Sequence, residues 1–187
     1  HCVQLTAEEI RLFARTGTGV AHCPCSNMRL ASGIAPVRAM LDAGMKVGLG
    51  VDGSASNDSG HMLNEARQTM LLQRVNQGGT AMSAREALAT ATRGGAAVLG
   101  RNDIGMLAPG MAADIACFDR RSVDFAGSDW DMLASLLFCG PTKASYTIIN
   151  GRIVVAEGQL VSMDMNRLLT NHRRMAHDLM VKAGHAS

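Results

Sequence analysis

The chain has 187 residues, of which 47% are hydrophobic and 18% are charged, and its formal net charge at pH 7 is +2. These values are typical of a globular protein and exclude an intrinsically disordered chain. The near balance of charge and the lack of a Lys or Arg run argue against nucleic acid as a main partner. Without an apolar stretch of bilayer length or a signal peptide, we expect no membrane contact and a cytoplasmic location.

The first third of the chain alternates between strand and helix signals. A capping box at Thr6 and Glu9 opens a helix that Gly17 ends. The expected elements are a strand end at residues 1–5, this helix, a strand at 20–23, a loop at 24–34, a helix at 37–43 and a strand at 47–51. Because no hairpin signal separates the strands, the pattern predicts a parallel sheet. Three such units fit the last three strands of a (β/α)8 barrel.

The rest of the chain changes from helical to β-rich. Helices are expected at residues 61–75 and, after a capping box that begins at Ser83, at residues 83–99. The later pattern predicts a strand at 114–118, a helix at 130–138 and a terminal amphipathic helix at 164–182. Asn150 and Gly151 favour the positive φ angles of a type I′ turn, so residues 146–155 are expected to form a hairpin.

Three polar residues near strand ends are the first candidates for chemistry. Asp52 follows the strand at 47–51 and precedes small residues, as a carboxylate at the catalytic face of a barrel enzyme would; a turn or helix-capping role fits this position equally well. His1 and His22 lie at or near the ends of the other two expected strands. A lone histidine is more often a packing residue than a ligand. The two histidines and Asp52 lie on three successive strands, however, so their side chains would converge at one end of the barrel. The other four histidines are expected to be surface or supporting residues.

Four segments together resemble the amidohydrolase superfamily, in the branch that holds guanine deaminase, S-adenosylhomocysteine deaminase and the triazine hydrolases. They are HCVQL at residues 1–5, AHCPCSN at 21–27, GVDG at 50–53 with the Ser and Asn at 56–57, and PGMAADIA at 109–116. The resemblance implies an α/β chain that is the C-terminal part of a (β/α)8 TIM-like metal-dependent hydrolase barrel, with a segment of a small β-sandwich domain. It implies barrel strands six to eight at residues 1–106, the sandwich segment at 107–160 and a C-terminal helix at 161–187.

The same resemblance implies the chemistry of the site. Asp52 would bind one zinc ion per active site and take a proton from the attacking water, and His1 would hydrogen-bond that water or the substrate. His22 and Asn27 would lie near the substrate. The family also needs a His-x-His motif and a His-x-x-Glu motif, and neither occurs in these residues. We therefore expect the remaining ligands to lie outside this chain, as they would if the chain were part of a longer polypeptide.

The implied reaction is the hydrolytic deamination of a small heterocyclic substrate, an amino-substituted N-heterocycle. SNMRLASGIAP at residues 26–36 is most similar to the 8-oxoguanine deaminases, whose reaction yields urate and ammonia; similar sequences are often labelled hydroxydechloroatrazine ethylaminohydrolase. Removal of an alkylamine or a halide from a triazine, deamination of guanine or a pterin, and a non-catalytic scaffold of the same fold stay open as alternatives. Homo-oligomerisation is implied by the resemblance alone.

Overall fold

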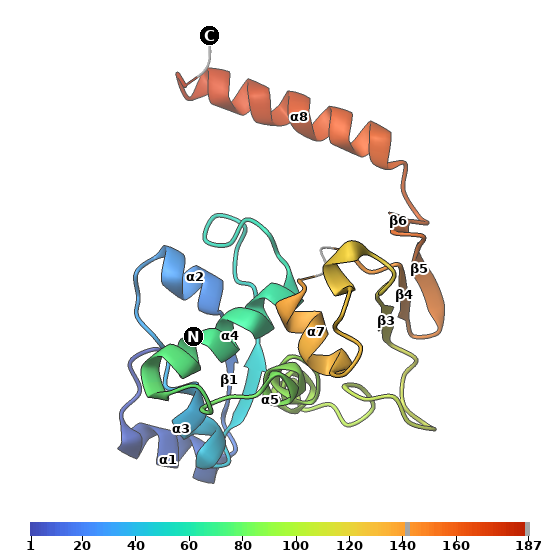
Figure 1. The fold of residues 1–187 in the computed structure, drawn as a ribbon. Coiled ribbons are helices and arrows are strands. Elements are labelled where there is room, and N and C mark those ends of the chain that lie inside the picture. Colours follow the sequence, from blue (N-terminus) through green and yellow to red (C-terminus); the bar gives the residue numbers. More distant parts are fainter. Residues whose placement is uncertain (141–142, 186–187) are drawn as a thin grey trace. The chain divides into compact units, whose positions relative to one another are not determined.

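The computed structural model describes residues 1–140 and 143–185, which fold as a mixed α/β chain (Figure 1). The chain divides into two compact units. The first unit comprises His1–Ala112 and Arg120–Thr142, and the second comprises Ala113–Asp119 and Lys143–Ser187. None of the described helices combines the length and the apolar run that a bilayer crossing requires.

The first unit is built from two parallel strands and the helices that precede and follow them. The strands are β1 (Gly19–His22) and β2 (Lys46–Leu49), and Val20 pairs with Val47 in their register. The helices, in chain order, are α1 (Ala7–Thr16), α2 (Pro24–Arg29), α3 (Val37–Asp42), α4 (Met62–Gln77), α5 (Ala84–Ala89), the π-helix η1 (Thr90–Gly94), α6 (Gly95–Val98), the 3-10 helix η2 (Val123–Phe125) and α7 (Met132–Phe138). The pairing of β1 with β2 confirms that the second and third expected strands are parallel neighbours.

Two capping boxes start helices of the first unit where the sequence predicts them. Thr6 caps α1 and Ser83 caps α5, and in each box the glutamate three residues later returns a hydrogen bond to the cap. These bonds satisfy N–H groups that the first turn of a helix leaves without a partner. Gly17 ends α1 in the left-handed conformation, with a φ of +68°, which a residue without a Cβ atom adopts at little cost.

Some sequence predictions are wrong in this unit. Residues 1–5 do not form a strand end, because they make a turn in which Cys2 has a φ of +51°, outside the extended region. The loop expected at 24–34 begins with the six-residue helix α2, whose first position is Pro24, a residue with the φ angle that a helix start needs. The helix expected at 83–99 forms, but its middle is the π-helical segment η1.

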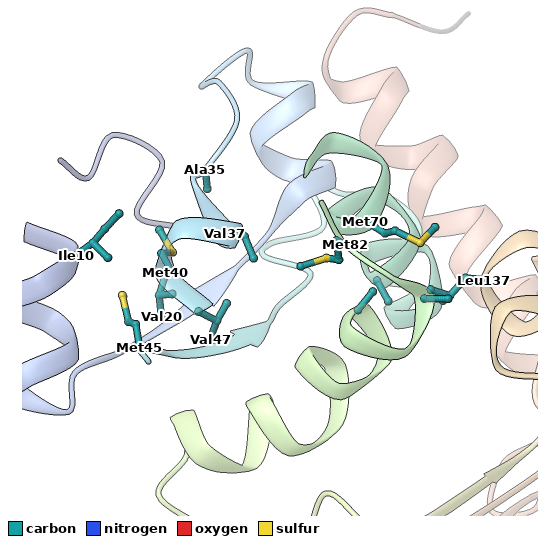
Figure 2. Close-up of a cluster of buried hydrophobic side chains, with 13 residues drawn as sticks. Ile10, Val20, Ala35, Val37, Met40, Met45, Val47, Met70, Met82 and Leu137 are labelled. Carbon is teal, nitrogen blue, oxygen red and sulfur yellow. The ribbon is translucent and has the colours of Figure 1, made fainter. Parts of the chain in front are cut away.

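One cluster of buried apolar side chains runs through the first unit (Figure 2). It joins the two strands to helices α1, α3, α4 and α5 and to α7. Aromatic residues make up only 3% of the chain, so methionines fill much of this core. The four with at most 4% exposure are Met40, Met45, Met70 and Met82. Because methionine is unbranched and adapts to irregular gaps, these side chains hold β1 and β2 against the helices.

The second unit is an antiparallel sheet followed by one long helix. The sheet has the order β3-β4-β5-β6, formed by β3 (Ile115–Cys117), β4 (Tyr146–Ile149), β5 (Arg152–Ala156) and β6 (Gln159–Leu160). Asn150 and Gly151 have φ angles of +48° and +77°, which confirms the predicted hairpin turn. Helix α8 (Met165–Lys182) has no buried residue. The boundaries predicted for the barrel, the sandwich segment and the terminal helix stay predictions. Helix α7 was expected within the sandwich segment, but it belongs to the first unit.

Candidate active site

Asp52 lies three residues beyond β2, in a backbone conformation with a φ of +65°. Its Oδ2 atom accepts hydrogen bonds from the hydroxyl of Ser26 at 2.6 Å and from the hydroxyl of Ser56 at 2.9 Å. These two bonds, with a further one from the Gly53 backbone, hold the pKa of the Asp52 carboxyl below its usual range. Asp52 is therefore an anion at neutral pH, as a proton acceptor or metal ligand must be.

His1 contacts both Asp52 and Asn27. The Nε2 atom of His1 lies 3.5 Å from Oδ2 of Asp52, and its Nδ1 atom lies 2.7 Å from Oδ1 of Asn27. Helix α2, which directly follows β1, supplies Asn27 together with Ser26. The structure thus brings together His1, Asn27 and Asp52, three of the four residues that the sequence predicts for the site. Ser26 and Ser56 lie in the quoted sequence motifs, although their bonds to Asp52 depend on the fold.

The fourth predicted residue, His22, makes no side-chain hydrogen bond to His1, Asn27 or Asp52. His22 is 1% exposed and shares its face of β1 with Val20, which belongs to the hydrophobic core. Within the described part of the chain, neither of its ring nitrogens has a hydrogen-bond partner. Burial lowers the pKa of His22 to about 4, so its imidazole is neutral at pH 7. Its predicted contact with substrate stays a prediction.

A second set of polar contacts, which the sequence did not predict, links the loop that carries Asp52 to helix α4. The side-chain amide of Asn57 donates to the carbonyl oxygen of Val51 at 2.8 Å and to the Glu65 carboxylate at 2.7 Å. The other oxygen of Glu65 accepts a hydrogen bond from the backbone N–H of Cys25 at 3.1 Å. Burial and this nearby carboxylate raise the pKa of the Cys25 thiol to about 12, so Cys25 is not a thiolate nucleophile.

The described residues of this chain do not form a complete zinc site. Zinc in enzymes takes at least three protein ligands, usually from His, Cys, Asp and Glu. In residues 1–140 and 143–185, no three such side chains lie close enough together to hold a metal ion. Asp52 offers one anionic oxygen ligand, so a zinc ion at this position would need further ligands from outside this chain.

Several known hydrolases are similar to this chain over about two fifths of their own length. The chain is 46% identical over 180 residues to 8-oxoguanine deaminase of Pseudomonas aeruginosa, covering 96% of this chain and 40% of that protein. It is 42% identical to 5-methylthioadenosine/S-adenosylhomocysteine deaminase of Pelotomaculum thermopropionicum, covering 94% of this chain and 41% of the relative. The crystal structure of atrazine chlorohydrolase from Arthrobacter aurescens, complexed with zinc, superposes with a TM-score of 0.86 at 40% identity, covering 91% of this chain and 38% of that one.

The chain therefore spans about two fifths of the length of the relatives it matches. The match to the family itself extends over residues 1–154, which include the candidate site, strands β3 and β4 and the start of β5. On this evidence the chain belongs to the amidohydrolase family.

Proposed function

We propose that the polypeptide carrying this chain is a zinc-dependent hydrolytic deaminase of an amino-substituted N-heterocycle. The single observation that carries the proposal is the contact between His1 and Asp52, with 3.5 Å between Nε2 and Oδ2, in a chain that belongs to the amidohydrolase family. In this proposal the first unit is part of a (β/α)8 barrel, and the missing metal ligands come from other barrel strands. The similar crystal structure with zinc supports the choice of metal.

The reaction requires one water molecule and the movement of its protons. The water oxygen bonds to the ring carbon that bears the amino group, the C–N bond breaks and ammonia leaves. A bound zinc ion would lower the pKa of the attacking water so that it is a nucleophile at neutral pH. Asp52, which is ionised, would accept a proton from the water at a carboxylate oxygen and pass it to the departing nitrogen. His1 would hydrogen-bond the attacking oxygen through Nε2.

In this proposal Asn27 acts on both His1 and the substrate. Its Oδ1 atom holds Nδ1 of His1, while its buried Nδ2 atom has no hydrogen-bond partner in the described residues. Buried amide N–H groups are nearly always paired, so this donor points to a partner that these residues do not supply. A carbonyl or ring nitrogen of a bound heterocycle would satisfy it.

The proposed substrate is 8-oxoguanine, which would yield urate and ammonia. The 46% identity to an 8-oxoguanine deaminase supports this choice. Guanine, a pterin and an amino- or halo-substituted triazine are the alternative substrates within the family. A non-catalytic scaffold of the same fold is the alternative to an enzyme. A cytoplasmic location and a homo-oligomeric state stay predictions.

The test is ammonia release by the zinc-loaded, full-length protein from 8-oxoguanine, guanine, isoxanthopterin, cytosine and hydroxylated triazines. We expect fast release from 8-oxoguanine and slow or no release from the others. Asp52→Ala should abolish turnover and lower zinc occupancy, whereas His1→Ala should lower turnover with zinc largely retained. Asp58→Ala is the matched control, because Asp58 is a carboxylate of the same loop whose side chain is 74% exposed. Normal turnover in Asp52→Ala would refute the proposal.

A further inference from the structure

The two segments that carry the candidate site meet on one buried carboxylate. Glu65, the fourth residue of α4, has an exposure of 0%. Its Oε1 atom accepts a hydrogen bond from Asn57 Nδ2 at 2.7 Å, and its Oε2 atom accepts one from the backbone N–H of Cys25 at 3.1 Å. Each oxygen serves a different segment, since Cys25 lies just after β1 and Asn57 lies in the loop after β2.

The bond to Asn57 holds the loop that carries Asp52. Asn57 Nδ2 also donates to the carbonyl oxygen of Val51, the residue directly before Asp52, at 2.8 Å. An amide nitrogen has two hydrogens, so Asn57 uses one on Val51 and the other on Glu65. The backbone that leads into Asp52 is thereby tied to α4 through a single side chain.

The bond to Cys25 holds the helix that carries the partners of Asp52 and His1. The cap residue of α2, Cys23, makes no side-chain capping hydrogen bond, so Glu65 satisfies an N–H group that the first turn would leave free. The next two residues, Ser26 and Asn27, bond to Asp52 and to His1. The orientation of the start of α2 therefore sets both of these contacts.

We infer that Glu65 is a positioning residue of the proposed deaminase, whose buried carboxylate bridges the segments after β1 and β2 and so aligns His1 with Asp52. The inference rests on the proposed function. Glu65 acts through Asn57 and Cys25 and does not itself contact His1 or Asp52 by any hydrogen bond described here. A carboxylate suits this position because both of its neighbours are N–H donors and each carboxylate oxygen is an acceptor.

The matched pair of variants is Glu65→Gln and Gln73→Glu. Glu65→Gln keeps the size of the side chain but turns an NH2 group toward one of the two N–H donors. Gln73 is equally buried on the same helix and donates to the carbonyl of Ala35 at 3.0 Å while accepting from the N–H of Arg38 at 3.1 Å. Gln73→Glu therefore makes the reverse exchange of one atom, at a place that carries no candidate site residue.

Hydrogen–deuterium exchange on the full-length protein reports the bridge without reference to activity. In Glu65→Gln we expect amide exchange in residues 24–29 and 51–57 to rise by at least about tenfold, because one end of the bridge loses its buried hydrogen bond and the other keeps only a weaker bond to a neutral amide oxygen. In Gln73→Glu the rise should instead fall in residues 35–39. Unchanged exchange at 24–29 and 51–57 in Glu65→Gln would overturn the inference.

Kinetics supply the second readout. At a temperature where both variants are folded, Glu65→Gln should lower kcat for ammonia release by at least about tenfold with KM little changed, as expected when catalytic groups are misaligned. Gln73→Glu should keep kcat within about twofold of the unaltered protein, on the same reasoning. Equal loss of kcat in the two variants would show that Glu65 is merely structural.

Two further outcomes are separable. If the unaltered protein releases no ammonia, the proposed function fails, while the exchange data still support or overturn the bridge. If Glu65→Gln does not fold, Asn57→Ala severs the bridge on the loop side alone. That variant should raise exchange in residues 51–57 and leave residues 24–29 protected, and protection of both segments would overturn the inference.

Discussion

The Nδ1 atom of His1 lies 2.7 Å from the amide oxygen of Asn27, and this contact determines which ring nitrogen faces Asp52. An amide oxygen only accepts hydrogen bonds, so Nδ1 must carry a proton. In the neutral imidazole, Nε2 is then the atom that can accept a proton, and it lies 3.5 Å from the Asp52 carboxylate. His1 and Asp52 thus form a pair able to share one proton, as the proposed deamination requires when a proton moves from water to the departing ammonia.

Loss of the Asn27 oxygen should slow the proposed reaction by releasing the His1 ring. We expect Asn27→Leu to lower kcat by about 10- to 100-fold, the range typical of residues that orient a catalytic or ligating histidine. Asn27→Asp keeps an acceptor for Nδ1 and should lose less. Steady-state ammonia release by the two full-length variants checks this, and equal rates for Asn27→Leu and the unaltered protein would show that the contact is dispensable.

Local signals were sufficient to predict several elements of the fold. The capping boxes at Thr6 and Ser83 and the hairpin turn at Asn150 each depend on residues within a few positions of one another. Asp52 was predicted at the end of a strand for the same reason, since the apolar run before it is continuous in the sequence.

The contacts that support Asp52 could not be predicted in this way. Helix α2 lacks a local start signal, because its cap residue, Cys23, makes no side-chain capping bond, and the N–H of Cys25 is satisfied by Glu65, 40 residues later. The expected strand end at residues 1–5 is absent because Cys2 has a positive φ angle, which the residue types of this segment do not predict. His22 is predicted near the substrate from its place at a strand end. The alternation of side chains along β1 places it on the same face as Val20, and its contact with substrate stays a prediction.

Stability in acid should depend on Glu86. The Ser83 backbone N–H and hydroxyl, together with Arg38, lower the pKa of Glu86 to about 2 from an ordinary value of 4.5. Because the pKa is lower in the folded state, the stabilisation is complete above pH 4.5 and is lost as the pH falls toward 2. Glu86→Gln should cost about 1 kcal/mol at pH 7, as expected for a weakened helix cap, and less at pH 3. Denaturant unfolding at both pH values measures this; a cost that does not change with pH would contradict it.

Gly94 and Gly95 should respond oppositely to alanine. A Cβ atom on Gly94 would overlap the carbonyl oxygen of Val47 in β2, whereas one on Gly95 meets no atom within 4 Å. Gly94→Ala must therefore push η1 away from β2 and should destabilise the protein by about 1–3 kcal/mol, the usual cost of overpacking. Gly95→Ala should be neutral or stabilising by up to about 1 kcal/mol, because alanine favours the helix. Thermal unfolding of the two variants compares them directly, and equal shifts in Tm would contradict the close approach of η1 to β2.

The buried imidazole of His22 should make the protein sensitive to mild acid. Its pKa is about 4 in the folded chain, against an ordinary value of 6.5, because burial disfavours the charged form. Between these two pH values the unfolded chain binds the proton more readily, so His22 contributes a loss of stability as the pH falls, of at most about 1.4 kcal/mol per pH unit. His22→Leu removes this contribution, and the free energy of unfolding of the variant should fall less steeply than that of the unaltered protein between pH 6.5 and 4.5.

His172→Leu is the control, because His172 is exposed on α8 and its replacement should leave the change of unfolding free energy with pH unaltered. Parallel slopes for His22→Leu and the unaltered protein would mean that His22 takes up a proton as easily in the folded chain as in the unfolded one.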